Sequence, residues 1–148
     1  MNALFASMID EARQNYSGHE ISVVMSPLPK SIGDLPLLKQ VISNLLSNAI
    51  KFSGKNEKSE IEIGWFQESE NVVYFIKDNG IGFDMKYAEN LFGVFRRLSN
   101  SEEYEGTGVG LALVKRIVER HGGRVWATGA PNDGATFYFT LPYVNIPE

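Results

Sequence analysis

Three glycines at alternate positions, in the stretch Gly106-Thr107-Gly108-Val109-Gly110-Leu111, constrain this chain more than any other feature. The stretch lies between a polar, acidic run (99–105) and an apolar segment with helical spacing. Glycine leaves one edge of the backbone bare, so consecutive N–H groups can turn toward an anion at the positive end of the following helix. The stretch therefore predicts a phosphate cradle, although a flexible turn into a helix explains the glycines alone equally well.

Length and composition exclude several classes of protein. The 148 residues predict one domain, 1–148, which is long enough to bury roughly two-thirds of its unfolded surface. The chain has no cysteine, which excludes disulfides, thiolate metal sites and thiol nucleophiles. Its 14 Lys+Arg and 18 Asp+Glu give a net charge of -4 without any basic run, so we expect no nucleic-acid partner. No apolar run approaches the ~18 residues of a spanning helix, and no basic leader precedes the first apolar residues. We therefore expect a soluble, cytoplasmic domain without direct membrane contact.

The clearest helix is predicted for residues 35–52. Its apolar side chains form one stripe: Leu38, Val41, Ile42, Leu45, Leu46 and Ala49. Asn44, Asn48 and Lys51 cluster on a second face, about 120° from that stripe at helical spacing. Asparagine is a mediocre helix former, so this polar edge suggests a ligand. The alternative is that the amides are solvated or satisfy neighbouring backbone groups.

The other patterns predict an α+β fold. We expect helices at 4–16 and from 111, and strands at 21–25, 61–65, 72–77, 125–128 and 135–142, the last two as a hairpin. The order is helix, strand, helix, two strands, lid, helix, two strands, which is typical of a two-layer sandwich with helices on one sheet face. A dinucleotide-binding fold is excluded because its glycine motif must follow a strand, whereas these glycines follow a polar loop.

A carboxylate ends the strand at 72–77, in Asp78-Asn79-Gly80-Ile81-Gly82. Such a carboxylate can accept a hydrogen bond from a base amine while glycines let the backbone approach closely. An ordinary Asp-Asn-Gly turn is the alternative. Residues 99–105 carry no long aliphatic side chain, so we expect a mobile lid there. The aromatic side chains Phe92 and Phe95, which precede it, fit core packing at least as well as ligand contact.

Together these motifs resemble the catalytic, ATP-binding domain of sensor histidine kinases. The resemblance covers nearly the whole chain and consists of the family's N, G1, F, G2 and G3 boxes, in order, at residues 44–52, 78–82, 92–97, 106–111 and 134–137. The part from residue 103 to residue 142 is most similar to kinases of the phytochrome type. The resemblance implies the Bergerat-type fold shared with gyrase, MutL and Hsp90 ATPases, in which a mixed sheet is covered by helices on one face and a mobile lid closes over ATP.

The resemblance also implies roles for the polar edge of the 35–52 helix. Asn48 is expected to coordinate Mg²⁺, Asn44 and Lys51 to meet the phosphates, and Phe52 to lie against the adenine. The chemistry agrees, because Mg²⁺ prefers oxygen ligands and an amide oxygen supplies one without adding negative charge.

The remaining site residues follow from the same resemblance. Asp78 is expected to accept from the adenine amine, and the backbone of 106–111 to hold phosphates. Arg97 is expected to steady the γ-phosphate during transfer, with Arg96 a weaker candidate. Further nucleotide contacts are implied at Gly80, Ile81, Gly82 and Thr136.

The chain departs from the family in one respect, because it has no phosphoacceptor box. His19 and His121 are not in that motif, and we interpret both as structural or exposed. When protonated, His121 would interact favourably with the end of its helix. The acceptor histidine is therefore expected on a separate dimerisation domain, with a response regulator downstream.

The leading hypothesis is a kinase domain that binds Mg·ATP and delivers the γ-phosphoryl group to that histidine, in two-component signalling. A nucleotide-gated clamp ATPase like Hsp90 or MutL is the alternative, but it needs a hydrolytic carboxylate near the position of Asn44. An anti-sigma-type serine kinase, or a scaffold that has lost transfer, is the third possibility.

Overall fold

The computed structural model describes residues 1–16, 18, 20–53, 58–86, 91–92 and 110–142. Along the chain the elements are α1 (Asn2–Asn15), β1 (Glu20–Met25), α2 (Leu35–Ser53), β2 (Lys58–Glu68), β3 (Asn71–Asp78), α3 (Gly110–Arg120), β4 (Val125–Gly129) and β5 (Ala135–Pro142). This is the predicted order of helices and strands. Among these residues, no helix is both long and apolar enough to cross a membrane.

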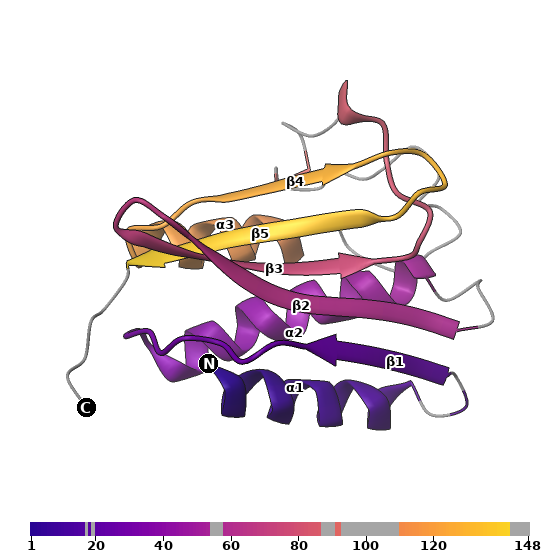
Figure 1. The fold of residues 1–148 in the computed structure, drawn as a ribbon, viewed down its shortest axis with the longest axis horizontal. Coiled ribbons are helices and arrows are strands. Elements are labelled where there is room, and N and C mark those ends of the chain that lie inside the picture. Colours follow the sequence, from indigo (N-terminus) through magenta and orange to yellow (C-terminus); the bar gives the residue numbers. More distant parts are fainter. Residues whose placement is uncertain (17, 19, 54–57, 87–90, 93–109, 143–148) are drawn as a thin grey trace.

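The strands form one mixed sheet in the order β1-β2-β3-β5-β4. β1 pairs with β2 in parallel, and the other neighbours are antiparallel, including the predicted β4–β5 hairpin. Figure 1 shows the helices gathered on one side of this sheet. The predicted two-layer α+β sandwich is therefore confirmed.

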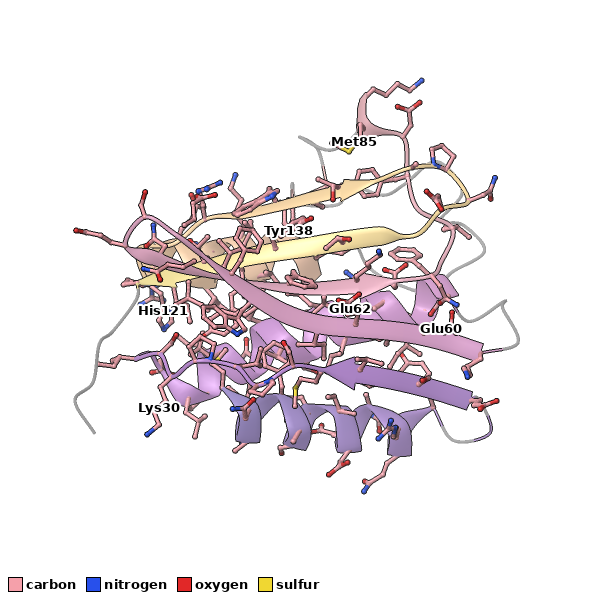
Figure 2. The ribbon with its side chains drawn as sticks, in the orientation of Figure 1. Lys30, Glu60, Glu62, Met85, His121 and Tyr138 are labelled. Atoms are coloured by element: carbon pink, nitrogen blue, oxygen red, sulfur yellow. The ribbon has the colours of Figure 1, made fainter. Side chains whose placement is uncertain are left out.

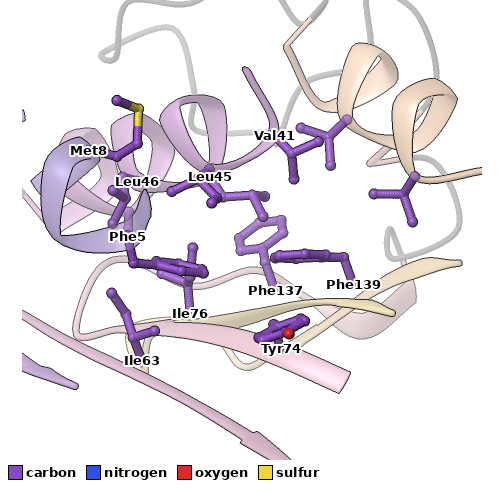
Figure 3. Close-up of a cluster of buried hydrophobic side chains, with 14 of the residues drawn as sticks. Phe5, Met8, Val41, Leu45, Leu46, Ile63, Tyr74, Ile76, Phe137 and Phe139 are labelled. Carbon is purple, nitrogen blue, oxygen red and sulfur yellow. The ribbon is translucent and has the colours of Figure 1, made fainter. Parts of the chain in front are cut away.

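The core lies between the sheet and α2. Alternate side chains of the central strands point toward the helices and are fully buried, namely Val72, Tyr74, Ile76, Phe137, Phe139 and Leu141. All six residues of the predicted α2 stripe are buried in the same cluster, and Figure 3 labels Val41, Leu45 and Leu46 among them. From α1, the buried ring of Phe5 contacts Tyr74, with 6.4 Å between ring centroids. The helical and strand periodicities thus placed the hydrophobic side chains on the correct faces.

Both ends of α2 are fixed by side chains. At its start, Asp34 Oδ1 accepts the Leu37 N–H at 3.0 Å, as an N-cap carboxylate does. At its end, the buried Ser53 hydroxyl donates to the Ala49 carbonyl at 2.6 Å and forms a hydrogen bond with the Ser59 hydroxyl at 2.7 Å. The second bond ties the last turn of α2 to the start of β2.

β2 is longer than the sequence predicted. It spans Lys58–Glu68 instead of 61–65, and every residue from Ile61 onward pairs with β3. The turn is therefore Ser69 and Glu70 alone, with Ser69 at a φ of 53°. Our prediction ended the strand early because residues 66–68 face solvent at least in part and lack an apolar alternation, whereas pairing with β3 extends it.

Candidate functional site

Asp78 ends β3 as a buried carboxylate with one unsatisfied oxygen. The residue is 3% exposed, and its Oδ1 accepts the Gly80 N–H at 2.8 Å. Its Oδ2 is buried and has no hydrogen-bond partner among the residues that the structure describes. Burial raises the pKa of this carboxyl from 3.8 to about 6, while the Gly80 and Ala135 N–H groups act in the opposite direction. An unpaired buried acceptor is costly, so the site is suited to a donor supplied by a ligand.

The loop after Asp78 is held by backbone groups from two distant parts of the chain. The Ile81 N–H donates to the Phe52 carbonyl at the end of α2, at 3.1 Å. On the other side, the Gly80 and Ile81 carbonyls accept N–H groups of the β4–β5 turn, from Gly134 at 3.0 Å and Asn132 at 2.6 Å. The N-box helix, the G1 loop and the G3 turn are thereby brought into contact.

The glycines of this loop are required by neighbouring backbone. A Cβ on Gly80 would lie 2.5 Å from the Phe52 carbonyl oxygen. Gly82 has a φ of 64°, and a Cβ there would lie 1.9 Å from the Ala130 carbonyl oxygen. From the sequence we expected these glycines to allow close approach of a ligand; in the structure they allow close approach of other parts of the protein backbone.

The polar edge of α2 faces the start of α3. A Cβ on Gly110, the first residue of α3, would lie 3.0 Å from Asn44 Oδ1. The Asn44 amide donates to the Gln40 carbonyl at 2.9 Å, so its donor half is satisfied within the helix, as the alternative interpretation proposed. Asn48 and Lys51 follow along α2, both half-buried. From Asn44 to Phe52, eight residues of helix span about 12 Å, a length that an extended nucleotide can follow.

Thr136 is not brought to this site. Its partners in the sheet are Lys77 and Thr128, whereas Asp78 pairs with Ala135. Since successive strand residues point to opposite faces, Thr136 lies on the sheet face away from Asp78. Ala135, which pairs with Asp78, is buried with the core. The nucleotide contact predicted for Thr136 therefore has no support from its place in the sheet.

Part of the predicted site lies outside the described residues. This applies to Gly106, Thr107, Gly108 and Val109, to Arg96, Arg97 and Phe95, to the expected lid at 99–105, and to His19. Gly110 and Leu111 are described and form the start of α3. Phe92 is also described, and it packs edge-on against Phe137 in the core, with 6.2 Å between ring centroids. For Phe92, the packing interpretation is confirmed.

His121 joins α3 to the loop before α2. Its Nε2 accepts the Asp34 N–H at 3.0 Å, and its Nδ1 lies 2.8 Å from the Ile117 carbonyl. The ring therefore contacts both segments, one through each of its nitrogens. The structural role predicted for His121 is thus confirmed, and its partner Asp34 is a contact that helix periodicity alone did not indicate.

Known proteins resemble this chain in sequence and in fold. The profile of a family described as histidine kinase-, DNA gyrase B- and HSP90-like ATPases matches residues 33–145. The chain belongs to this ATPase family. Phytochrome-like protein Cph1 of Synechocystis sp. is 41% identical over 129 residues, covering 87% of this chain and 17% of the relative. Sensor histidine kinase WalK of Bacillus subtilis is 38% identical over 117 residues, covering 78% of this chain and 19% of the relative.

Solved histidine kinase structures superpose well on this ATPase domain. The mycobacterial sensor histidine kinase MprB has a TM-score of 0.81 at 26% identity, covering 96% of this chain and 95% of that one. Full-length ShkA in complex with AMPPNP has a TM-score of 0.78 at 27% identity, covering 99% of this chain and 30% of that one. The resemblance to histidine kinase catalytic domains, including those of phytochrome-like proteins, is therefore confirmed.

Proposed function

We propose that this domain binds Mg·ATP and transfers the γ-phosphoryl group to a histidine on a dimerisation domain, within a two-component sensor kinase. Membership of an ATPase family and the histidine kinase names of WalK and MprB support this proposal. The observation that carries it is the unpaired, buried Oδ2 of Asp78 beside the junction of α2, the G1 loop and the β4–β5 turn.

The base is recognised by Asp78. Adenine carries an exocyclic amine, which can donate to Oδ2, whereas guanine presents a carbonyl oxygen at the same ring position. A buried carboxylate facing that carbonyl would leave two acceptors unpaired, which disfavours GTP. Phe52, whose carbonyl already holds the G1 loop, would lie against the ring.

The phosphates would follow the polar edge of α2 toward the start of α3. Lys51 supplies positive charge, and the N-terminus of α3 supplies N–H groups and the positive end of a helix. Among the described residues no cluster of His, Asp and Glu could hold a metal ion. We assign the metal to the Asn48 amide oxygen and the phosphates themselves, a donor set that would fit Mg²⁺. When bound, Mg²⁺ neutralises the triphosphate charge.

Transfer on this domain needs positioning and charge neutralisation, without a covalent enzyme intermediate. We assign γ-phosphate stabilisation to Arg97. The acceptor histidine belongs to a dimerisation domain, and a response regulator receives the phosphoryl group next. Asn44 is an amide where a clamp ATPase needs a carboxylate to activate water, which favours transfer over hydrolysis.

Replacing Asn48 tests the metal assignment. Asn48→Ala should weaken Mg·ATP binding by roughly tenfold or more, because it removes the one protein oxygen assigned to the metal. Binding of ATP in EDTA should change little. Calorimetric titration with and without Mg²⁺ measures both affinities. Ser47→Ala is the matched control, since the Ser47 hydroxyl contacts Tyr16 of α1 instead. Equal affinities of Asn48→Ala and the wild type for Mg·ATP would remove the assignment.

The transfer reaction is tested with ATP labelled at the γ-phosphate. The domain is incubated with and without a dimerisation domain from a related phytochrome-like kinase, and the labelled species are separated. Acid-labile, base-stable label on the dimerisation domain is expected, because phosphohistidine has that stability. Release of labelled inorganic phosphate, without any labelled protein, would instead support a hydrolytic function.

A further inference from the structure

The β2–β3 ladder stops where the candidate adenine site begins. Its last backbone pair on this side is Ile61 with Asp78. β2 itself starts earlier, at Lys58, and from there it pairs with β1 on its other edge. On the side of residues 58–60 away from β1, backbone N–H and C=O groups therefore need hydrogen-bond partners. The backbone of β3 does not supply them.

The side chain of Asn79 supplies those partners. Its Oδ1 accepts the Glu60 N–H at 3.0 Å, and its Nδ2 donates to the Lys58 carbonyl at 3.0 Å. The same nitrogen lies 3.5 Å from a carboxylate oxygen of Glu60, which Figure 2 labels on β2. A carboxamide has one donor face and one acceptor face, as a peptide group does, so this side chain continues the ladder for one more step.

Because the Asn79 side chain pairs with β2 in place of the backbone, the main chain can leave the strand direction at Gly80. A continuing strand would carry Gly80 along β2 by about 3.3 Å per residue. Instead the chain turns, the Gly80 N–H reaches back to Asp78 Oδ1 at 2.8 Å, and Ile81 reaches α2. With Oδ1 held by that N–H, Oδ2 is the oxygen that stays unpaired.

We propose that Asn79 is a positioning residue, whose amide completes the β2–β3 ladder so that Gly80 can orient the Asp78 carboxylate toward the adenine amine. The inference rests on the proposed function, in which Asp78 binds that amine. Aspartate cannot replace Asn79, because an ionised carboxylate has no donor for the Lys58 carbonyl and would lie beside the carboxylate of Glu60.

The test compares ATP with purine riboside triphosphate, which lacks the exocyclic amine, in calorimetric titrations. Asn79→Ala should weaken ATP binding by roughly tenfold, as expected for a misoriented charged hydrogen bond. Its affinity for the analogue should be unchanged, so that the preference for ATP falls. Asn79→Asp should lose the preference as well. Gln67→Ala is the control, since that amide bonds the Ser69 carbonyl at the opposite end of the same hairpin.

Each other outcome overturns a defined part of the proposal. Equal weakening of both nucleotides would show that Asn79 has a structural role only, and no change in either would show that it has none. If Asp78→Asn loses the preference for ATP but Asn79→Ala keeps it, the positioning role fails while the adenine contact stands. If Asp78→Asn keeps the preference, the adenine contact itself fails. Should Asn79→Ala not fold, Asn79→Asp, which has the same size and keeps the acceptor for Glu60, gives the same comparison.

Discussion

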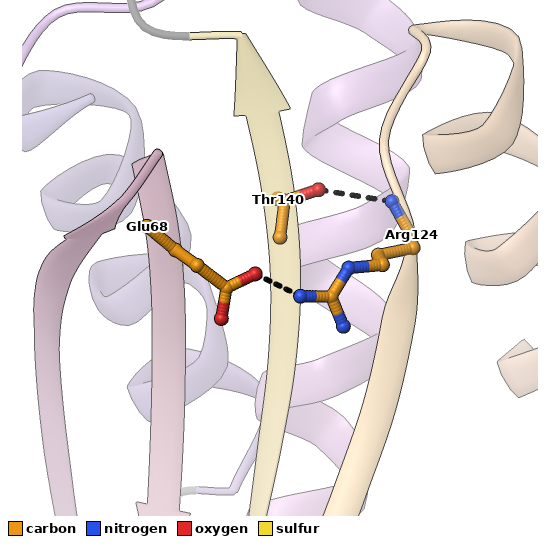
Figure 4. A network of polar contacts seen from close by, with 3 residues as sticks. All are labelled: Glu68, Arg124 and Thr140. Atoms are coloured by element: carbon orange, nitrogen blue, oxygen red, sulfur yellow. Dashed lines mark hydrogen bonds and ion pairs between the residues drawn. The ribbon is translucent and has the colours of Figure 1, made fainter. Parts of the chain in front are cut away.

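The two ends of the β2–β3 hairpin are built in opposite ways. At the turn end, backbone pairing runs to Glu68 and Asn71, and only two residues connect the strands. The contacts there are peripheral: Glu68 pairs with the exposed Arg124, whose N–H bonds Thr140 on β5 at 3.0 Å (Figure 4). At the other end the backbone pairing stops at Asp78, and the Asn79 side chain forms the next hydrogen bond to β2.

The difference shows what a binding site demands of a strand end. At the turn end, two residues and the backbone pairing of β2 with β3 close the hairpin. The Asp78 end is held by α2 and by the β4–β5 turn, and these contacts join segments far apart in the sequence. This arrangement fixes the loop while leaving one carboxylate oxygen unpaired, which a self-contained turn would not do.

Glycine substitutions should show this contrast most strongly. Gly82→Ala places a Cβ at positive φ against the Ala130 carbonyl, so we expect it to lower the free energy of unfolding by roughly 4 kcal/mol. At the turn end Ser69 already adopts a φ of 53°, and Ser69→Gly should change that free energy by less than about 1 kcal/mol. Urea denaturation measures both. Similar losses at the two ends would remove the contrast.

The pH dependence of stability should reveal the buried carboxyl. The pKa of Asp78 is raised to about 6 in the folded protein, above its value of 3.8 in the unfolded chain. The carboxyl therefore favours folding fully below about pH 4, and this contribution is lost as the pH rises through 6, amounting to about 3 kcal/mol.

Asp78→Asn isolates that contribution, because the amide does not titrate. Without nucleotide, the free energy of unfolding of the wild type relative to Asp78→Asn should fall between pH 4 and pH 7 and then level off. Denaturant unfolding across this range measures the difference. A difference that stays constant with pH would show that Asp78 is not held in a desolvated environment.

The sequence predicted those parts of the molecule that depend on local periodicity. The α2 stripe, the order of the elements and the β4–β5 hairpin followed from apolar spacing and turn residues. The position of Asp78 at the end of a buried strand also followed, because a continuous apolar run ended there. Each of these features is set by residues that are close together in the sequence, within a few helical turns or within one strand.

What the sequence did not predict depends on pairing between distant segments. The role of Asn79 is set by the register between β2 and β3, and the local Asp-Asn-Gly pattern cannot specify that register. Thr136 was chosen from a motif match, although the alternation of Ala135 and Phe137 already placed Thr136 on the other face.

The smallest effect is expected at Glu68. Its carboxylate and Arg124 are 44% and 56% exposed, and exposed ion pairs contribute roughly 0–1 kcal/mol. Arg124 also lies over the Trp126 ring, 4.2 Å from its centroid, and stays placed without its acidic partner. Glu68→Gln should therefore lower the free energy of unfolding by less than about 0.5 kcal/mol, with ATP affinity unchanged. A loss of roughly 2 kcal/mol or more would show that the turn end depends on tertiary contacts as the Asp78 end does, because exposed pairs do not reach that value.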